Sequence, residues 1–526
     1  MKTTSIVIFC ITAFCLSAQN NSVILDHNNS AAFISEGGTF FYDFSDTNKG
    51  YRVPKNSNFE SIFSAQFWFA GKDENNQIRM ARGGQPSGNY DFFNGPISGA
   101  GTYSNPDYQS RWDMPIWKIC QTEIDHFNLW WNCNNGSVVI GCDTVTSPSA
   151  DLLQRIESWP ATGDVAAGQS YYLAPFYDRN GDGVYSPLND GDYPILKGCC
   201  GAYMIQNDAA ESHTYSNTDS LGLEIHYQFY QYRTWDYLND VTFIDVMAIN
   251  RGTTNYHEFT HSFLVDGEIG NVFDDFFGVD STLNCMYFYN ADNLDEANSM
   301  TIGYGENPPA LGIVSLRNPM SSSLVPFDPF MTSSTWNYMH GLQFGGEVML
   351  NPSNNPTNFM FNGNPNIPSE WSMYSASSIP NDYRGLASYQ KGDFNVGDTL
   401  LQTYAIISAR TGNHIENVQS VLDIASSLHT FYNTTNNPVC QNGTLSLEEN
   451  SESEFSIYPN PAKDHLTVSG IHNNLFGSTA IISELSGKKL FTLNISKSTI
   501  DFTLEGFAPG LYLMTIGDLT KRFVVE

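Results

Sequence analysis

The segment 455–526 constrains the fold of this chain more than any other part. It opens as a strand that Pro459 and Pro461 interrupt. Each proline fixes φ and removes a backbone donor, so this turn cannot be absorbed into a longer strand. Further short β-type runs follow, separated by turn signals, at 478–485, 488–495, 499–504, 511–517 and 520–525. About seven short strands at this spacing predict a small immunoglobulin-like β-sandwich.

The same segment resembles the type A C-terminal sorting domain of proteins that the bacterial type IX secretion system exports. The matching residues occur in order: Tyr458-Pro459-Asn460-Pro461-Ala462, Asp464, Leu466, Val468, Ser486-Gly487-Lys488, Pro509-Gly510-Leu511-Tyr512 and Lys521-Arg522-Phe523-Val524. The resemblance implies an address that a translocon and a sortase read, and that is usually removed as the cargo is attached to the surface or released. An accessory sandwich with no targeting role is the alternative.

The beginning of the chain predicts entry into the same export route. Lys2 is followed by an apolar run at 6–16 and by the small residue Ala18, a pattern typical of a signal peptide over residues 1–18. The run is too short to span a bilayer as a helix, and no later stretch approaches that length. We therefore expect no transmembrane segment and a secreted or cell-surface protein that passes through the periplasm.

Residues 19–435 predict one large β-rich, sandwich-like body, with room for two subdomains. Strands are expected at 39–44, 61–70, 137–140, 224–232, 241–250 and 257–265. One helix is expected at 414–432, with Asn413 as its N-cap and Glu416 completing a capping box. The polar stretch 436–454 is predicted to be a linker. A net charge of −31 argues against nucleic-acid binding, because phosphates need basic patches.

Seven cysteines follow the predicted signal peptide: Cys120, Cys133, Cys142, Cys199, Cys200, Cys285 and Cys440. An odd number leaves at least one unpaired or bonded to another chain. Cys133 and Cys142 flank a hairpin signal, so we expect them to face each other across two strands. The adjacent pair at 199 and 200 is not expected to bond to itself.

The chemical motif with the most specific spacing is Asp178-Arg179-Asn180-Gly181-Asp182-Gly183. Oxygen-bearing residues at alternate positions, followed by glycine, are typical of a loop that wraps a hard cation. The expected last ligand is displaced to Asp190 and Asp192. The motif predicts a structural Ca²⁺ site formed by Asp178, Asn180, Asp182, Asp190 and Asp192, with an Asx-rich turn as the alternative.

A second acidic cluster comprises Asp266, Glu268, Asp274, Asp275 and Asp280. These carboxylates repel one another unless water solvates them or a cation bridges them, and the sequence leaves both possibilities open. A glycosidase acid and base could also come from such a group, but the sequence gives no separation between carboxylates.

His257-Glu258-Phe259-Thr260-His261 spells HExxH, which binds zinc in metallopeptidases when it lies on a helix. Here apolar residues alternate with a period near two, which predicts a strand instead. On a strand the two histidines share a face about 13 Å apart, at about 3.3 Å per residue, which is too far for one metal ion. Two histidines on a half-buried sheet are the favoured interpretation.

The tryptophans Trp112, Trp117, Trp130, Trp131 and Trp159 are expected to pack in a core rather than to form a carbohydrate platform. The body also resembles a group of large uncharacterised secreted proteins, through motifs at 178–194, 267–280, 304–309 and 382–397; this resemblance implies no activity. We therefore expect a calcium-stabilised exoprotein with a binding or structural role, its ligand a surface polysaccharide or another extracellular molecule. The alternative is a secreted hydrolase, either a zinc metallopeptidase through HEFTH or a glycosidase.

Overall fold

The computed structural model describes residues 22–42, 50–83, 90–113, 116–136, 140–297, 301–434, 438, 440, 455–471, 479–484, 488–495, 497–504, 506–508, 510–516 and 519–525. The predicted signal peptide lies outside the described residues, and so does the predicted linker apart from Pro438 and Cys440. The chain divides into two compact units, Met1–Gln441 and Asn442–Glu526. We call the first unit the body.

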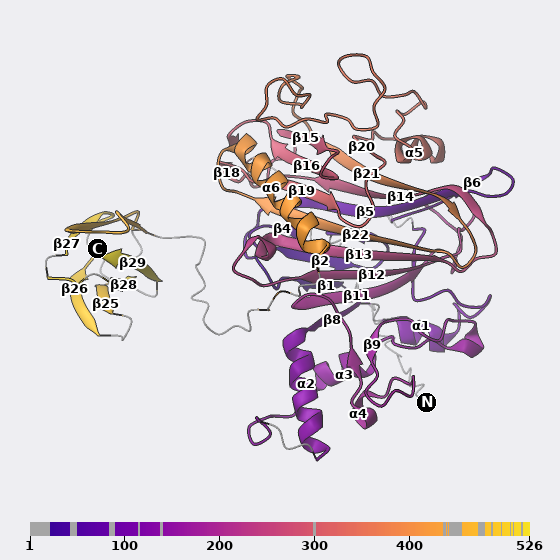
Figure 1. Cartoon of the computed structure of the whole chain (residues 1–526), viewed down its shortest axis with the longest axis horizontal. Helices are drawn as coiled ribbons and strands as arrows, with labels where there is room; N and C mark the ends of the chain where they lie inside the picture. The colour runs from indigo at the N-terminus through magenta and orange to yellow at the C-terminus, as the bar shows by residue number, and fades with distance from the viewer. Residues whose placement is uncertain are drawn as a thin grey trace, which may run out of the picture. The chain divides into compact units, whose positions relative to one another are not determined.

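The body is built around two nine-stranded antiparallel sheets (Figure 1). The first sheet has the order β1-β2-β4-β5-β14-β21-β20, and β3 and β6 also pair with β5. Its strands are β1 (Ser22–Leu25), β2 (Ala31–Ser35), β3 (Thr39–Phe40), β4 (Tyr51–Arg52), β5 (Glu60–Lys72), β6 (Ile78–Arg82), β14 (Tyr256–Gly267), β20 (Ser322–Leu324) and β21 (Arg384–Phe394).

The second sheet has the order β15-β16-β19-β22-β13-β12-β11-β7, and β8 also pairs with β11. Its strands are β7 (Phe93–Asn94), β8 (Ile116–Cys120), β11 (Cys200–Asn207), β12 (Leu223–Gln231), β13 (Val241–Asn250), β15 (Asp275–Asp280), β16 (Cys285–Asn290), β19 (Ala310–Ser315) and β22 (Thr399–Ala409). The expectation of a mainly β, sandwich-like body is confirmed.

Aromatic side chains from both sheets fill the space between them. Phe67 on β5 stacks on Tyr227 of β12, with ring centroids 5.4 Å apart, and its centroid lies 5.8 Å from that of Tyr404 on β22. All three side chains are fully buried. Buried aromatic surface of this kind is a major stabilising contribution to a sandwich core. Phe67 and Tyr227 lie on strands that were predicted, whereas the strand of Tyr404 was not. Of the strand predicted at 137–140, only Ile140 is among the described residues, and it lies in a turn.

Helix α6 (His414–Tyr432) covers the outer face of the second sheet, where it packs on β16, β19 and β22 (Figure 1). Its buried side chains recur at helical spacing: Val418, Val421, Leu422, Ala425 and Leu428. The Asn413 side chain accepts the N–H groups of Ile415 and Glu416, and the Glu416 side chain completes the capping box. The predicted helix and its N-cap are confirmed.

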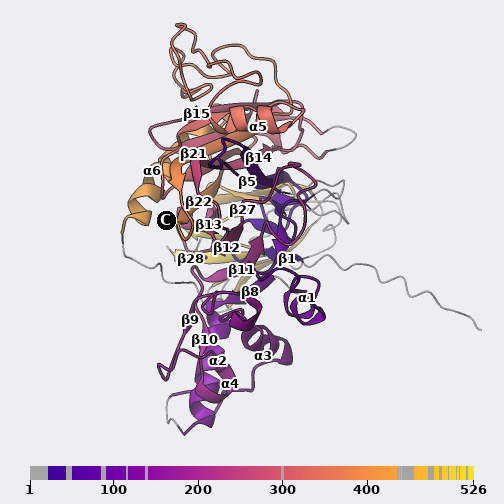
Figure 2. The ribbon, with the colours of Figure 1, turned by 90° about the vertical axis from the view of Figure 1, so that its right-hand side faces the viewer.

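Further helices lie at the two ends of the body (Figure 2). At one end are α1 (Pro106–Trp112), α2 (Gln121–Asn134), α3 (Ala150–Glu157) and α4 (Pro187–Asp190), with the two-stranded ribbon of β9 (Phe176–Tyr177) and β10 (Tyr193–Pro194). At the other end α5 (Thr332–Met339) belongs to the long connection between β20 and β21. None of the helices in the described part of the chain has the length and hydropathy of a membrane span.

Three disulfides join six of the seven cysteines: Cys120–Cys200, Cys133–Cys142 and Cys199–Cys440. Cys285 is buried and free, as the odd count requires. The adjacent cysteines 199 and 200 bond to separate partners, as expected. The bond between Cys133 and Cys142 forms, but the hairpin expectation was wrong because Cys133 lies in the last turn of α2.

The second unit has its own core. Its described residues form a three-stranded sheet, β23-β24-β27, and a four-stranded sheet, β26-β25-β28-β29. The strands are β23 (Ser456–Tyr458), β24 (His465–Ser469), β25 (Thr479–Glu484), β26 (Lys489–Asn494), β27 (Ile500–Thr503), β28 (Gly510–Ile516) and β29 (Leu519–Val525). Leu466, Phe502, Met514 and Phe523 are among the buried side chains that both sheets contribute. The predicted small β-sandwich is confirmed.

Candidate functional site

The predicted calcium loop lies between β9 and β10, which pair in antiparallel register with Tyr177 opposite Tyr193. The two tyrosine rings stack with centroids 4.7 Å apart and planes 18° apart. Asp178 directly follows Tyr177, and Asp192 directly precedes Tyr193. The ribbon therefore closes the loop at its base and brings Asp178 and Asp192, the first and last predicted ligands, to the same end of the two strands.

The first half of the loop winds tightly around Asp178. The carboxylate of Asp178 accepts the N–H groups of Gly181 and Gly183, both at 2.7 Å. Gly181 and Gly183 have φ of 76° and 77°, in the left-handed region that glycine adopts without strain. Asn180 donates its side-chain amide to Asp182 Oδ2 at 3.0 Å. The glycines thus allow the turn that the motif predicts.

Asp192 fastens the second half of the loop. It is fully buried, and its carboxylate accepts the N–H of Arg179 and the N–H of Ser186, both at 2.9 Å. Asp190 ends helix α4 and is half-buried. No three of the carboxylates of Asp178, Asp182, Asp190 and Asp192 place oxygens within 4.8 Å of one another. In the structure, backbone N–H groups donate hydrogen bonds to the carboxylate oxygens of Asp178 and Asp192.

Arg179 anchors the loop to helix α2. Its guanidinium donates to Asn128 Oδ1 at 2.9 Å and to Asn132 Oδ1 at 3.2 Å, and it lies 4.7 Å from the centroid of the Trp131 ring. Trp131 in turn donates Nε1–H to the carbonyl of Leu188 at 3.1 Å. A cation–π contact and two charge-assisted hydrogen bonds fix the loop on the helix. The loop is therefore attached to helix α2 through the side chain of Arg179.

Partly exposed tyrosines surround this loop. Tyr172 and Tyr177 are 63% and 44% exposed, and Tyr171 donates its hydroxyl to the carbonyl of Gly183 at 3.0 Å. The rings of Tyr171 and Tyr172 meet edge to face with centroids 4.9 Å apart. We call Tyr171, Tyr172, Tyr177 and Tyr193 the tyrosine face. By contrast, Trp112, Trp117 and Trp159 are buried in a core, which confirms core packing for these three tryptophans.

The second predicted acidic cluster separates into three parts. Asp266 and Glu268 meet Asp382, a residue more than a hundred positions away in the chain, and oxygens of the three carboxylates lie within 4.8 Å of one another. The described residues hold one further group of that kind, but it contains the sulfurs of the Cys120–Cys200 disulfide, which are not metal ligands.

Asp274 and Asp275 turn towards Asp295, a residue that the motif analysis missed. Burial, and then the charge of Asp295, raise the pKa of Asp274 to about 7. Asp275 is 1% exposed, and its Oδ2 accepts the N–H of Ile269 at 2.9 Å. The remaining predicted member, Asp280, accepts the N–H groups of Thr282 and Leu283 and so caps a turn at the end of β15.

The HEFTH segment lies on β14, as the period of two predicts. A β-bulge between His257 and Thr260 adds one residue against β5, and Glu258 adopts φ of 52° within it. His261 is fully buried, whereas His257 is partly exposed and bonds to Asn76 Oδ1 at 3.0 Å. The expectation that both imidazoles share a face was wrong, because the extra residue inverts the alternation.

Glu258 is not placed as a catalytic base. Its carboxylate forms an ion pair with Lys72 at 2.9 Å. The hydrogen bond from Lys72 is the largest of the effects on this carboxyl, and its pKa is lowered from the ordinary value. A base that activates water near neutral pH needs a raised pKa instead. Neither the geometry nor the electrostatics of HEFTH suits a zinc peptidase.

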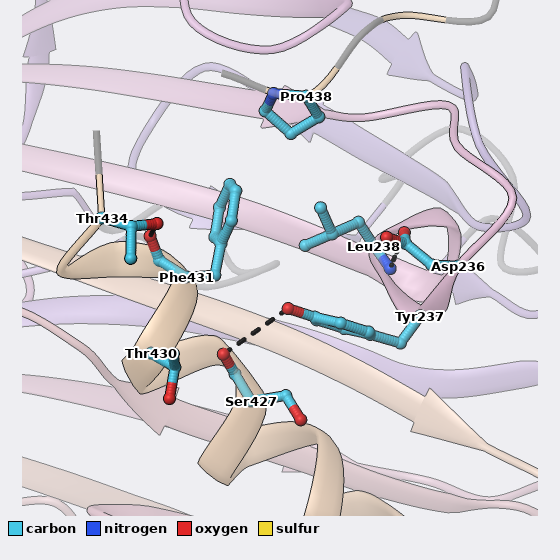
Figure 3. A pocket seen from close by; sticks show the side chains of 8 residues that line it. All are labelled: Asp236, Tyr237, Leu238, Ser427, Thr430, Phe431, Thr434 and Pro438. Carbon is cyan, nitrogen blue, oxygen red and sulfur yellow. Dashed lines mark hydrogen bonds between the residues drawn. The ribbon is translucent and has the colours of Figure 1, made fainter. Parts of the chain in front are cut away.

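A pocket of about 480 Å³ lies between the 3-10 turn Tyr237–Asp240 and the last turns of α6 (Figure 3). The residues that line it are Asp236, Tyr237, Leu238, Ser427, Thr430, Phe431, Thr434 and Pro438. The Tyr237 hydroxyl points at the carbonyl of Ser427, 3.5 Å away. Of the lining residues Asp236 alone carries a carboxylate, and it caps the turn by accepting the N–H of Leu238. The pocket therefore assembles no catalytic group.

Among known proteins, an agarase and a polysaccharide lyase each match part of the chain. Beta-agarase A of Zobellia galactanivorans is 32% identical over 84 residues, which are 16% of this chain and 15% of the agarase. The alignment with a polysaccharide lyase of known structure covers 57% of this chain and 34% of the lyase chain, at 7% identity and a TM-score of 0.15. So low a score supports no common fold. The chain thus spans only a small part of the agarase and about a third of the lyase.

A protein family matches the end of the chain. The secretion system C-terminal sorting domain covers residues 456–526, which form the separate seven-stranded sandwich described above. The match begins at the strand before the Pro459–Pro461 turn, where the sequence motif also begins. In this unit Asn460 Oδ1 accepts the N–H of Val524, so the turn is fastened to the last strand. Residues 456–526 are a secretion system C-terminal sorting domain, and the protein is a type IX secretion cargo that is exported to the cell surface or the extracellular space.

Proposed function

We propose that the body is an extracellular binding protein that docks a neutral polysaccharide on the tyrosine face, next to a calcium-stabilised loop. The observation that carries the proposal is the placement of Tyr171, Tyr172, Tyr177 and Tyr193 around the loop 178–192. Two of these rings are stacked at its base, and two are joined edge to face beside it. Exported cargo that remains at the cell surface or in the medium meets glycans there.

Tyrosine suits this task because its ring offers an apolar face and its hydroxyl a polar tip. Tyr172 and Tyr177 expose 63% and 44% of their surface, and neighbouring rings and hydrogen bonds hold the group in place. A pre-ordered aromatic surface loses little side-chain entropy when a sugar ring packs on it. A net charge of −31 favours a neutral over an anionic polymer.

Calcium would contribute by holding the platform in one conformation. The alternating oxygens of Asp178, Asn180 and Asp182, followed by a glycine in the left-handed region, follow the spacing of known Ca²⁺ loops. Asp190 and Asp192 would supply the remaining oxygens from the far side of the loop. Ion binding to the folded form alone stabilises that form, and here it would order Tyr172 and Tyr177.

The alternative of a secreted hydrolase has less support. HEFTH lies on a bulged strand with its two imidazoles in different surroundings. Among the carboxylates considered for a glycosidase, Asp266 is held in an ion pair with Arg384. The agarase match spans 84 residues of the chain, too few to cover the body, so its activity is not carried over.

A retention assay tests this proposal. The purified body is run through native gels that contain agarose, xylan, mannan or a β-glucan, with 1 mM calcium, on the order of the weakest natural sites. We expect retention by at least one polymer, and a tenfold or greater loss for Tyr172→Ala combined with Tyr177→Ala. Tyr374→Ala, at a site with the same 44% exposure as Tyr177, is the matched control. Equal retention of the double variant and the unmodified body would refute the proposal.

A further inference from the structure

We propose that Asp266, Glu268 and Asp382 form a second Ca²⁺ site, at the ends of β14 and β21, independent of the loop 178–192. Strand pairing explains why these residues meet. Asp266 lies opposite Arg384 in antiparallel register. Continuing that register by two residues places Glu268 opposite Asp382, and the period of two keeps both on the face of Asp266 and Arg384.

The ligand atoms are already gathered. Carboxylate oxygens of Asp266, Glu268 and Asp382 lie within 4.8 Å of one another. Asp266 is 7% exposed, Glu268 is half-buried and Asp382 is exposed. The three carboxylates are thus buried at Asp266 and exposed to solvent at Asp382, where water could complete the coordination of an ion.

A separate observation points to a missing ligand. Oδ2 of Asp266 accepts the Nε–H of Arg384 at 3.1 Å, but Oδ1 of Asp266 is buried and has no hydrogen-bond partner. A buried carboxylate oxygen without a partner is costly, since it has lost its water and received nothing in return. A cation bound by the cluster would satisfy this oxygen.

The charge balance supports the same conclusion. Three carboxylates face one guanidinium, and Arg384 also binds Asp328 at 2.7 Å. The carboxylates of the cluster thus outnumber the cationic side chain that contacts them, and a divalent cation would balance the excess negative charge.

The donor set indicates a hard cation. Three carboxylates are hard ligands, which favour Ca²⁺ or Mg²⁺ over zinc. Ca²⁺ accepts an irregular set of oxygens that water completes, whereas Mg²⁺ requires near-ideal octahedral geometry. Ligands of unequal burial that come from two different strand ends therefore suit Ca²⁺ better.

A bound ion would join three parts of the body. Asp266 ends β14, Asp382 precedes β21, and Arg384 connects both to Asp328 in the long connection after β20. The ion would therefore fix the exit of that connection, which contains α5, to the edge of the first sheet. Helix α5 in that connection lies at the end of the body opposite the helices α1–α4 (Figure 2).

Native mass spectrometry of the secreted body tests the assignment by counting ions. The protein is stripped with a chelator and titrated with Ca²⁺ alone, and in a second series with Mg²⁺ alone. We expect Asp382→Asn and Glu268→Gln each to lose one Ca²⁺ relative to the unmodified body, and Mg²⁺ to bind this site at least tenfold more weakly. Asp382 is exposed, so its substitution preserves the fold, and Asp393→Asn, an exposed carboxylate on β21, is the control.

The count also separates this site from the loop. Asp178→Asn changes the ions bound by the loop alone, so the loss caused by Asp382→Asn must persist in the Asp178→Asn background. An unchanged Ca²⁺ count in both Asp382→Asn and Glu268→Gln would overturn the proposal and leave a proton-sharing carboxyl cluster. Tighter binding of Mg²⁺ than of Ca²⁺ would overturn the choice of ion.

Discussion

His261 stacks on Phe69 with ring centroids 4.6 Å apart, and both side chains are fully buried between the two sheets. Neither ring nitrogen of His261 has a hydrogen-bond partner. Burial therefore disfavours the charged imidazole and lowers its pKa to about 3. The histidine that completes the HExxH spelling behaves as a neutral aromatic residue of the core.

Acid should destabilise the body through this histidine. The unfolded chain binds a proton below about pH 6.5, whereas the native imidazole binds one only near pH 3, so stability is lost as the pH falls below 6.5. The loss attributable to His261 is about 2 kcal/mol at pH 5. Urea unfolding at pH 7 and pH 5 should show a smaller pH effect in His261→Phe. His257→Gln, at the partly exposed histidine, should keep the full effect; an equal effect in His261→Phe contradicts the prediction.

The regular parts of the fold were predictable from the sequence because one physical pattern dominates each of them. In α6 the apolar residues repeat at helical spacing behind an Asn413 cap, and in β13 a β-branched and aromatic run sets the strand. Helix α2 was missed, since only Ile124 and Phe127 are buried along its fourteen residues. Two buried positions give too weak a period to separate a helix from a loop.

Which candidate site residues lie near one another was predictable only where they are close in sequence. The loop 178–192 follows from local spacing, but the meeting of Glu268 with Asp382 depends on which strands pair. The side of β14 on which His257 lies depends on one extra residue in a bulge. Asp382 and Arg384 belong to the motif at 382–397, and only the register of β14 and β21 brings them beside Asp266 and Glu268.

Calcium should raise the thermal stability of the body through the loop 178–192. At a hundredfold excess over the dissociation constant, one site adds about 2.7 kcal/mol. Asp178→Asn should reduce the increment, because Asp178 supplies the first ligand of the proposed site and also holds the turn through Gly181 and Gly183. Differential scanning calorimetry with calcium and with EDTA measures this gain in stability.

The control for calcium is Asp143→Asn, a substitution of an exposed carboxylate in the turn after α2. It should leave the calcium increment unchanged. If Asp178→Asn and Asp143→Asn responded alike, the loop would be an Asx-rich turn and not an ion site. Any increment that remains in Asp178→Asn should disappear when Asp382→Asn is added.

The long-range disulfide should matter more than the local one. Cys199–Cys440 closes a separation of 241 residues, and Cys133–Cys142 closes one of 9. In the chain-entropy description the two contributions differ by about 3 kcal/mol, because the unfolded chain loses more freedom when a longer loop is closed. Replacing both cysteines of each pair by serine and measuring denaturant midpoints gives the comparison. A larger loss of unfolding free energy on removing the 133–142 disulfide than on removing the 199–440 disulfide would contradict the prediction.

Deleting residues 455–526 should stop export and leave the body folded. The sorting domain and the body each have a hydrophobic core of their own, so we expect each to fold without the other. The truncated protein should accumulate in the periplasm, because the signal that the outer translocon reads is gone. Cell fractionation locates the protein, and its melting temperature should match that of the secreted body. Asn460→Ala removes the hydrogen bond that fastens the Pro459–Pro461 turn to Val524, and it should lower export without changing the body. Export of the truncated protein at the level of the full chain would show that a second signal exists within the body.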